Sequence, residues 1–147
     1  MKILFIAFKG VYNTSFQLVQ QTGADSVLLT NSFQGLEKDI FSISGNYSIV
    51  YMFGVDKTLV GKVRIETCAN NKDGTINTDF DIPYLEKKLR SVEISYTVSN
   101  KPTRYLFNAA YYHMLKKNPN TIFIHIPSQK GMSIEMMNKL IEIFRGI

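Results

Sequence analysis

The sequence predicts an α/β fold of three layers, in which helices cover both faces of a mixed, mostly parallel sheet. Apolar segments of strand length alternate along the chain with segments whose apolar residues recur at helical spacing. Several of the strands are apolar throughout, as expected for strands that are covered on both faces. We find no repeat, linker or low-complexity segment, so residues 1–147 are expected to form one domain.

The first half of the chain supplies three of the predicted strands. They are expected at residues 2–8, 26–30 and 47–53. One helix should begin at Asn13 or Thr14, either of which can cap its N-terminus, and should end at Gly23. A second helix should follow the capping candidates Asn31 and Ser32.

The second half begins with a strand of a different kind. Between residues 61 and 70 polar and apolar residues alternate, which predicts a strand with one polar face carrying Arg64, Glu66 and Cys68. A polar loop is then expected at residues 70–81. The remaining expected elements are a helix that opens at Pro83, a strand at 92–98, a helix at 103–117, a strand at 121–126 and a helix capped by Ser133. In this last helix Ile134, Met137, Ile141 and Phe144 are expected to face inward.

Composition argues against several classes of partner and cofactor. The formal charge is +5, but the basic residues are scattered and form no cluster with stacking aromatic residues, so we expect no nucleic-acid partner. No run approaches the roughly 20 apolar residues of a membrane-spanning helix. Cys68 is the single cysteine, which excludes an internal disulfide and suggests the cytoplasm. No metal-binding or glycine-rich phosphate motif is present, so no metal or cofactor is expected.

Two motifs lie where a strand leads into a helix and where the next strand ends. Residues 99–108 read S-N-K-P-T-R-Y-L-F-N, and residues 123–127 read F-I-H-I-P. They resemble the pyroglutamyl-peptidase I family, also called pyrrolidone-carboxylate peptidases, in which the corresponding segments read S-N-x-A-G-x-[FY]-x-C-N and F-I-H-V-P. Members of that family are cysteine peptidases that remove N-terminal pyroglutamate.

The resemblance implies a catalytic site built from a cysteine, a histidine and a carboxylate. His125 matches the histidine. The carboxylate of the family lies in a segment similar to G-R-x-x-I-x-x-E-x-x-A, which places Glu66 at its position although residues 61–69 are two residues shorter. The nucleophile position holds Phe107. By themselves, a glutamate on a polar strand face and a histidine at a strand end are more often solvated or structural than catalytic.

Other positions also depart from the family pattern. Thr67 stands where an arginine usually follows the carboxylate, so a cationic helper is expected to be missing. The chain is shorter than typical members, and its N-terminal loop at residues 7–15 keeps only Phe8 as a clear counterpart of the aromatic wall. The resemblance implies a substrate pocket that includes Phe8, Val55 and Asn108.

Three functions follow from these observations. The first is a relative of the peptidases that lacks peptidase activity and keeps a ligand or partner site at Glu66 and His125. The second is an active hydrolase of the omega-peptidase class with another nucleophile, either Cys68 or a hydroxyl such as that of Ser99 or Thr103. The third is a plain interaction module. The expected partner is a small peptide or pyroglutamyl-like ligand, and a homo-oligomer is also considered.

Overall fold

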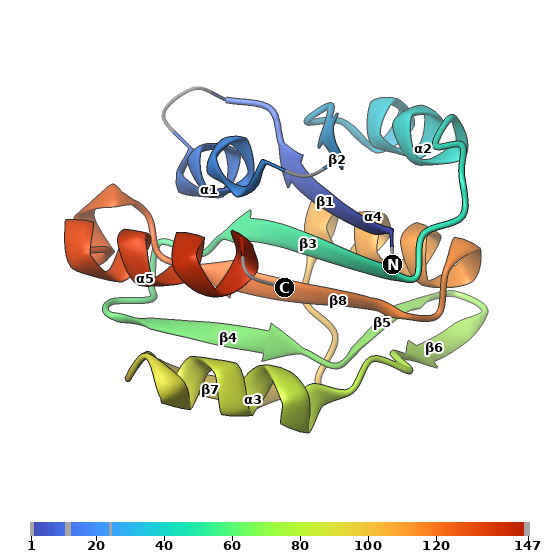
Figure 1. Cartoon of the computed structure of the whole chain (residues 1–147). Helices are drawn as coiled ribbons and strands as arrows, with labels where there is room; N and C mark the ends of the chain where they lie inside the picture. The colour runs from blue at the N-terminus through green and yellow to red at the C-terminus, as the bar shows by residue number, and fades with distance from the viewer. Residues whose placement is uncertain (1, 11–12, 24, 146–147) are drawn as a thin grey trace.

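The computed structural model describes residues 2–10, 13–23 and 25–145, and these residues contain a six-stranded sheet (Figure 1). Its strands are β1 (Ile3–Phe8), β2 (Asp25–Leu29), β3 (Ile49–Val55), β4 (Lys62–Glu66), β7 (Ser95–Ser99) and β8 (Thr121–Ile126). The strand order is β2-β1-β3-β8-β4-β7. Every neighbouring pair is parallel except β4 and β8, which are antiparallel. The prediction of a mixed, mostly parallel sheet is confirmed.

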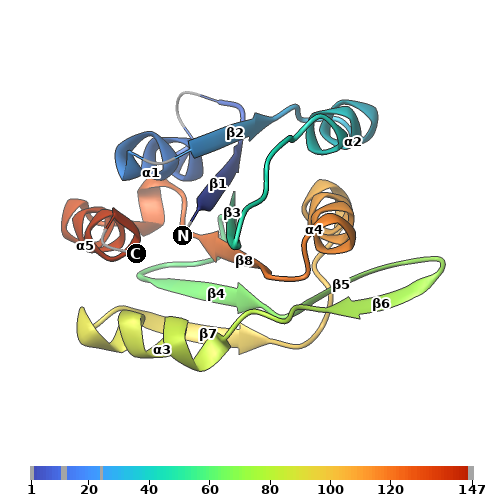
Figure 2. The same cartoon turned by 45° about the vertical axis from the view of Figure 1, so that its right-hand side comes forward.

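Helices cover both faces of this sheet, which gives the predicted three layers (Figure 2). One layer consists of α1 (Thr14–Thr22), α3 (Ile82–Ser91) and α5 (Ile134–Arg145). The other consists of α2 (Phe33–Phe41) and α4 (Tyr105–Lys117), together with a hairpin of β5 (Cys68–Asn71) and β6 (Gly74–Asn77). None of the helices in the described ranges is long and apolar enough to cross a membrane.

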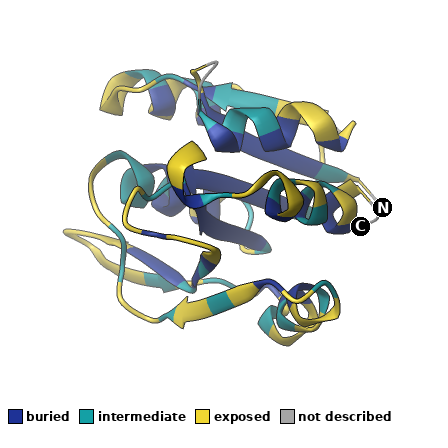
Figure 3. Cartoon of the chain, turned by 90° about the vertical axis from the view of Figure 1, so that its left-hand side faces the viewer, coloured by how far each residue is buried: buried dark blue, intermediate teal, exposed yellow. Residues whose placement is uncertain are grey.

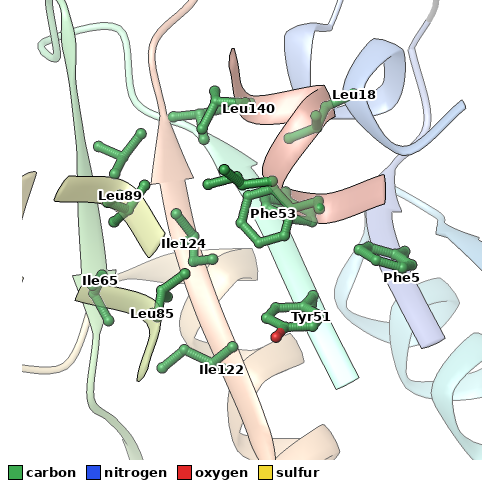
Figure 4. Close-up of a cluster of buried hydrophobic side chains, with 14 of the residues drawn as sticks. Phe5, Leu18, Tyr51, Phe53, Ile65, Leu85, Leu89, Ile122, Ile124 and Leu140 are labelled. Carbon is green, nitrogen blue, oxygen red and sulfur yellow. The ribbon is translucent and has the colours of Figure 1, made fainter. Parts of the chain in front are cut away.

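The strands divide the core into two clusters because successive side chains point to opposite faces. Figure 4 shows the cluster under α1, α3 and α5, where Phe53, Leu89 and Ile124 meet. The central strands are buried along their length, whereas the outer helix surfaces are exposed (Figure 3). On β8 the same alternation turns Phe123 and His125 toward the α4 side, so the candidate site lies in the second layer.

Local capping follows the sequence closely at the first helix. Asn13 is the N-cap of α1, since its Oδ1 accepts a hydrogen bond of 2.8 Å from the Ser15 amide. Thr14, the other capping candidate, instead donates its hydroxyl to the Pro127 carbonyl at 2.6 Å. Gly23 ends the helix with φ of 70°, a conformation that glycine adopts without strain.

The alternating segment does not form one strand, which corrects the prediction for residues 61–70. It breaks at Thr67, whose amide and hydroxyl both donate to the Ser99 carbonyl, at 3.0 and 2.9 Å. Beyond this point β5 leaves the main sheet and pairs with β6. The polar loop expected at residues 70–81 is therefore in part a hairpin.

The inward face of the last helix also differs from the prediction. Ile134 is 82% exposed, whereas Met136, Leu140, Ile143 and Phe144 are buried. These four follow the i, i+4, i+7, i+8 spacing of a single helical stripe. Ile134 precedes the first of them by two residues, which places it on the opposite side of the helix.

Candidate functional site

Glu66 and His125 lie side by side on neighbouring antiparallel strands. Glu66 is the last residue of β4, and His125 is the fifth residue of β8. Glu66 Oε2 is 2.8 Å from His125 Nδ1, and both side chains are at most 2% exposed. The Tyr111 hydroxyl of α4 donates to the Glu66 carbonyl at 2.7 Å, which fixes the end of β4 against the helix. The two residues that match the family's carboxylate and histidine are thus in direct contact.

Arg64 is a cation at this site that the sequence analysis missed. Its Nε donates to Glu66 Oε2 at 2.6 Å, and its Nη2 is 2.9 Å from Asp56 Oδ2. Arg64 precedes Glu66 by two residues on β4, so the two side chains leave the same face. Arg64 therefore brings a positive charge to Glu66, whereas Thr67, which follows Glu66, carries none. The alternation alone could have identified Arg64.

The hydrogen bonds around His125 define its tautomer. Nδ1 lies 2.8 Å from Glu66 Oε2 and 3.3 Å from Arg64 Nη2. Arginine can only donate, so Nδ1 cannot donate to Glu66 and also accept from Arg64. We take the shorter contact, the one with Glu66, as the hydrogen bond of Nδ1. Glu66 Oε2 also accepts from Arg64 Nε, as expected of an ionised carboxylate. We therefore assign a proton to Nδ1, which leaves Nε2 as the ring nitrogen that could accept one.

The ion pairs continue from Glu66 through Arg64 to Asp56. Partial burial by itself would raise the pKa of Asp56, but hydrogen bonds from the Thr58 hydroxyl and amide and from Arg64 lower it to about 2. For Arg64 burial acts in the opposite direction and would lower the pKa, but the carboxylates of Glu66 and Asp56 raise it. Arg64 and Asp56 are consequently both charged at neutral pH.

Phe107 occupies the space beside the imidazole. It is the third residue of α4, and its ring meets the His125 ring edge to face with centroids 4.8 Å apart. The Phe107 ring also packs against the rings of Phe8 and Phe123, with centroid distances of 5.2 and 5.8 Å. Phe107 is half-buried, so one side of its ring remains open to the cavity described next.

A cavity of about 690 Å³ opens in front of Phe107 and His125. Its walls come from the loop after β3, from β4 and from the turn between β7 and α4. The ionisable residues that line it are Asp56, Lys57, Arg64, Glu66, Lys101, Arg104, Tyr105 and His125. A smaller cavity of about 310 Å³, between α1 and the start of α5, has no ionisable residue in its lining. Of these two cavities, only the larger one therefore brings ionisable side chains together.

Solved structures with a similar arrangement of strands and helices include pyrrolidone carboxyl peptidases. The enzyme from Thermus thermophilus has a TM-score of 0.81 at 16% identity, with 97% of each chain covered. The enzyme from Thermococcus litoralis has a TM-score of 0.76 at 18% identity, covering 98% of this chain and 90% of the other. For the enzyme from Fervidobacterium islandicum the TM-score is 0.75 at 18% identity, with 100% and 96% covered.

This chain has the pyrrolidone carboxyl peptidase fold. Its sequence matches no protein-family model, and no curated protein matches it either. The likeness to the solved structures extends over nearly the whole chain at identities of 16 to 18%. The TM-scores establish the fold, and at identities this low the arrangement of the site must be judged from the side chains themselves.

Within this fold, the three residues expected in the pocket lie in different surroundings. Val55 lines the cavity. Phe8 does not, because it is buried and packs against the ring of Phe107. Asn108 does not line it either: its side chain bonds to Asn70 of β5, with Nδ2 donating to the carbonyl at 2.9 Å and Oδ1 accepting from the amide at 3.0 Å. Asn108 thus ties α4 to the hairpin.

The nucleophile candidates Cys68, Ser99 and Thr103 differ in their access to the cavity. Cys68 is buried outside the cavity lining, its Sγ donates to the Asn100 carbonyl at 3.4 Å, and burial raises the pKa of its thiol. Ser99 and Thr103 do line the cavity, but the Ser99 hydroxyl is bound to the backbone of Lys101. Val11 and Tyr12 of the expected N-terminal loop lie outside the described residues.

Proposed function

We propose that this protein is a pyroglutamyl-peptidase-like protein that binds a small ligand beside Glu66 and His125 without cleaving pyroglutamyl peptides. The observation that carries the proposal is the edge-to-face contact of Phe107 with His125, at 4.8 Å between ring centroids. At this position, the third residue of a helix, a cysteine would gain a nucleophilic thiolate from the helix N-terminus. Phenylalanine offers no atom that can attack a carbonyl.

Phenylalanine at position 107 also leaves His125 without the proton-donating nucleophile that a catalytic histidine needs. With the proton on Nδ1, His125 Nε2 is ready to accept a proton, but Phe107 has none to give. The ring of Phe107 further fills the space next to the imidazole, where an acyl group would be held. Covalent catalysis at this position is therefore incompatible with the side chain present.

A ligand site nevertheless fits the geometry better than a plain interaction module does. Small-molecule sites are concave, with volumes of roughly 300–1,000 Å³ and a few convergent polar groups. The cavity of about 690 Å³ falls in this range, and Arg64, Glu66 and His125 converge on it. Charged groups buried beside an open cavity are more typical of functional sites than of structural cores.

A fluorogenic pyroglutamyl amide tests the loss of activity. At high protein concentration, we expect fluorophore release to equal that of the His125→Ala variant. His113→Ala is the matched control, because His113 lies on α4 outside the cavity lining. Turnover that disappears in His125→Ala but persists in His113→Ala would overturn the proposal. Ser99→Ala, Thr103→Ala and Cys68→Ser would then identify the nucleophile of the alternative, an active hydrolase.

A further inference from the structure

We propose that the ligand of the cavity is a small organic anion, whose carboxylate or phosphate group is held by Lys57, Lys101 and Arg104. This inference rests on the proposed function, since it names the ligand class of the same site. It depends on the balance of charge around the cavity, on the two loops that supply the cations and on the apolar walls between them.

The cavity walls carry more positive than negative charge. Four cationic side chains line it, namely Lys57, Arg64, Lys101 and Arg104, against the two carboxylates of Asp56 and Glu66. Both carboxylates are bound to Arg64, at 2.9 and 2.6 Å. The charge of Arg64 is therefore compensated within the protein. Within the described part of the chain, Lys57, Lys101 and Arg104 make no ion pair.

These three cations reach the cavity from two separate loops. Lys57 lies in the loop that follows β3, and Lys101 and Arg104 lie in the turn that leads from β7 into α4. Like charges that face one cavity repel each other, and the field inside a cleft walled by protein is stronger than at an open surface. An anion in the cavity would relieve this repulsion by contacting both loops.

The start of α4 adds to the same potential. Arg104 is the N-cap residue and makes no side-chain capping hydrogen bond, and the first turn contains no acidic residue. No acidic side chain of the helix's own first turn therefore compensates the positive end of its dipole, and Tyr105 and Phe107 of this turn line the cavity. This contribution is secondary to that of the three cationic side chains.

Apolar walls indicate what carries the anionic group. Val55, Pro102, Tyr105 and Phe107 line the cavity between the charged residues. Tyr105 is 78% exposed, so its ring is available to cover a bound molecule. The ligand that fits is a compact ring or apolar body with a carboxylate or phosphate. A neutral lactam would leave the three cations without a partner.

Three probes test this inference by NMR titration of the full chain. They are L-pyroglutamate, its neutral amide L-pyroglutamamide, and phenyl phosphate, which distinguishes a phosphate from a carboxylate. We expect at least one anion to shift the resonances of His125 and of Lys101 and to bind about tenfold more tightly than the amide. Binding should weaken as salt is raised, because the cations are exposed.

Charge-removing variants locate the contact. Lys101→Met and Arg104→Met should each weaken anion binding about tenfold, whereas Lys87→Met, an exposed lysine of α3, should leave it unchanged. If the amide and the acid bind equally well and these variants change neither affinity, the ligand is not selected for its negative charge. That result would overturn this inference but not the proposed ligand site. Anion binding that shifts only residues outside the cavity would also overturn it. If no probe shifts His125, both this inference and the proposed ligand site fail.

Discussion

Gly54 lies directly against the ring of Phe107. A Cβ atom at position 54 would come within 2.8 Å of Phe107 Cε1 and 2.9 Å of Phe107 Cδ1, closer than carbon atoms approach in proteins. Gly54 is paired with His125 in the register of β3 and β8, so the glycine lies beside the histidine that the ring covers. The Phe107 ring can pack against β3 beside His125 because position 54 carries no side chain.

We therefore expect Gly54→Ala to destabilise the fold by about 1–3 kcal/mol, the usual cost of an added methyl group in a packed region. Urea unfolding followed by circular dichroism measures this. In a Phe107→Ala background the same substitution should cost less, since two of the three nearest atoms disappear. The third is Phe123 Cζ at 2.9 Å, so relief should be partial. An equal cost in both backgrounds would contradict the steric account.

Phe107→Cys should produce a reactive thiol without restoring peptidase activity. The new cysteine would be the third residue of α4, where the helix N-terminus favours the thiolate. Alkylation by iodoacetamide near neutral pH should be faster than that of Cys68, whose pKa is raised by burial. Because the Phe107 ring is half-buried, its loss should cost about 1–3 kcal/mol, less than for a fully buried ring.

Turnover of a pyroglutamyl amide by Phe107→Cys should stay near background. Arg64 neutralises the Glu66 carboxylate that would otherwise stabilise a protonated His125, and the Thr67 hydroxyl is engaged by Ser99. The assay is best made in a Cys68→Ser background, which leaves one thiol. Full stability together with efficient turnover would show that only the nucleophile had been lost.

The fold could be predicted because its signals are local. β8 occupies residues 121–126 as predicted, since a continuous apolar run is bounded by turn residues. The break at Thr67 could not be predicted in the same way, because the alternating pattern runs through it without a change. The break depends on the Ser99 carbonyl, which lies 32 residues away in the sequence.

The site was predictable where a motif carried it and missed where the topology assembled it. Glu66 and His125 came from the segments at residues 61–69 and 123–127, and Arg64 was open to inference from the alternation on β4. Asp56 had no local signal, because it reaches Arg64 only through the pairing of β3 and β4 with the two sides of β8. The burial of Glu66 was also unexpected, since α4 covers the face that the sequence marks as polar.

Glu66→Gln should destabilise the protein by about 2–4 kcal/mol, because it removes the buried charge that compensates the partly buried guanidinium of Arg64. Glu135→Gln is the matched control. Glu135 is 79% exposed in an i,i+4 pair with Lys139, and its loss should cost less than about 0.5 kcal/mol. Both are measured by urea unfolding at neutral pH. Similar small losses for the two variants would mean that the buried ion pair contributes nothing to stability.

The charge of Asp56 should make stability depend on pH in the acid range. Folding lowers the pKa of this carboxyl from 3.8 to about 2. As pH falls, the unfolded chain takes up the proton first, so the stabilisation is complete above about pH 5 and is lost as pH falls through about 2. Because solvent partly screens Asp56, we expect its contribution to the free energy of unfolding to be about 1 kcal/mol.

Asp56→Asn should remove this contribution. The difference in free energy of unfolding between the wild type and Asp56→Asn should be about 1 kcal/mol near pH 6 and should shrink toward zero near pH 2. Urea unfolding at a series of pH values measures it, with Asp73→Asn in the exposed hairpin turn as the control. A difference that stays constant with pH would mean that Asp56 acts through the shape of its hydrogen bonds to Thr58 and Arg64. The carboxylate would then be dispensable as a charge, and Arg64 would depend on Glu66 alone for its compensation.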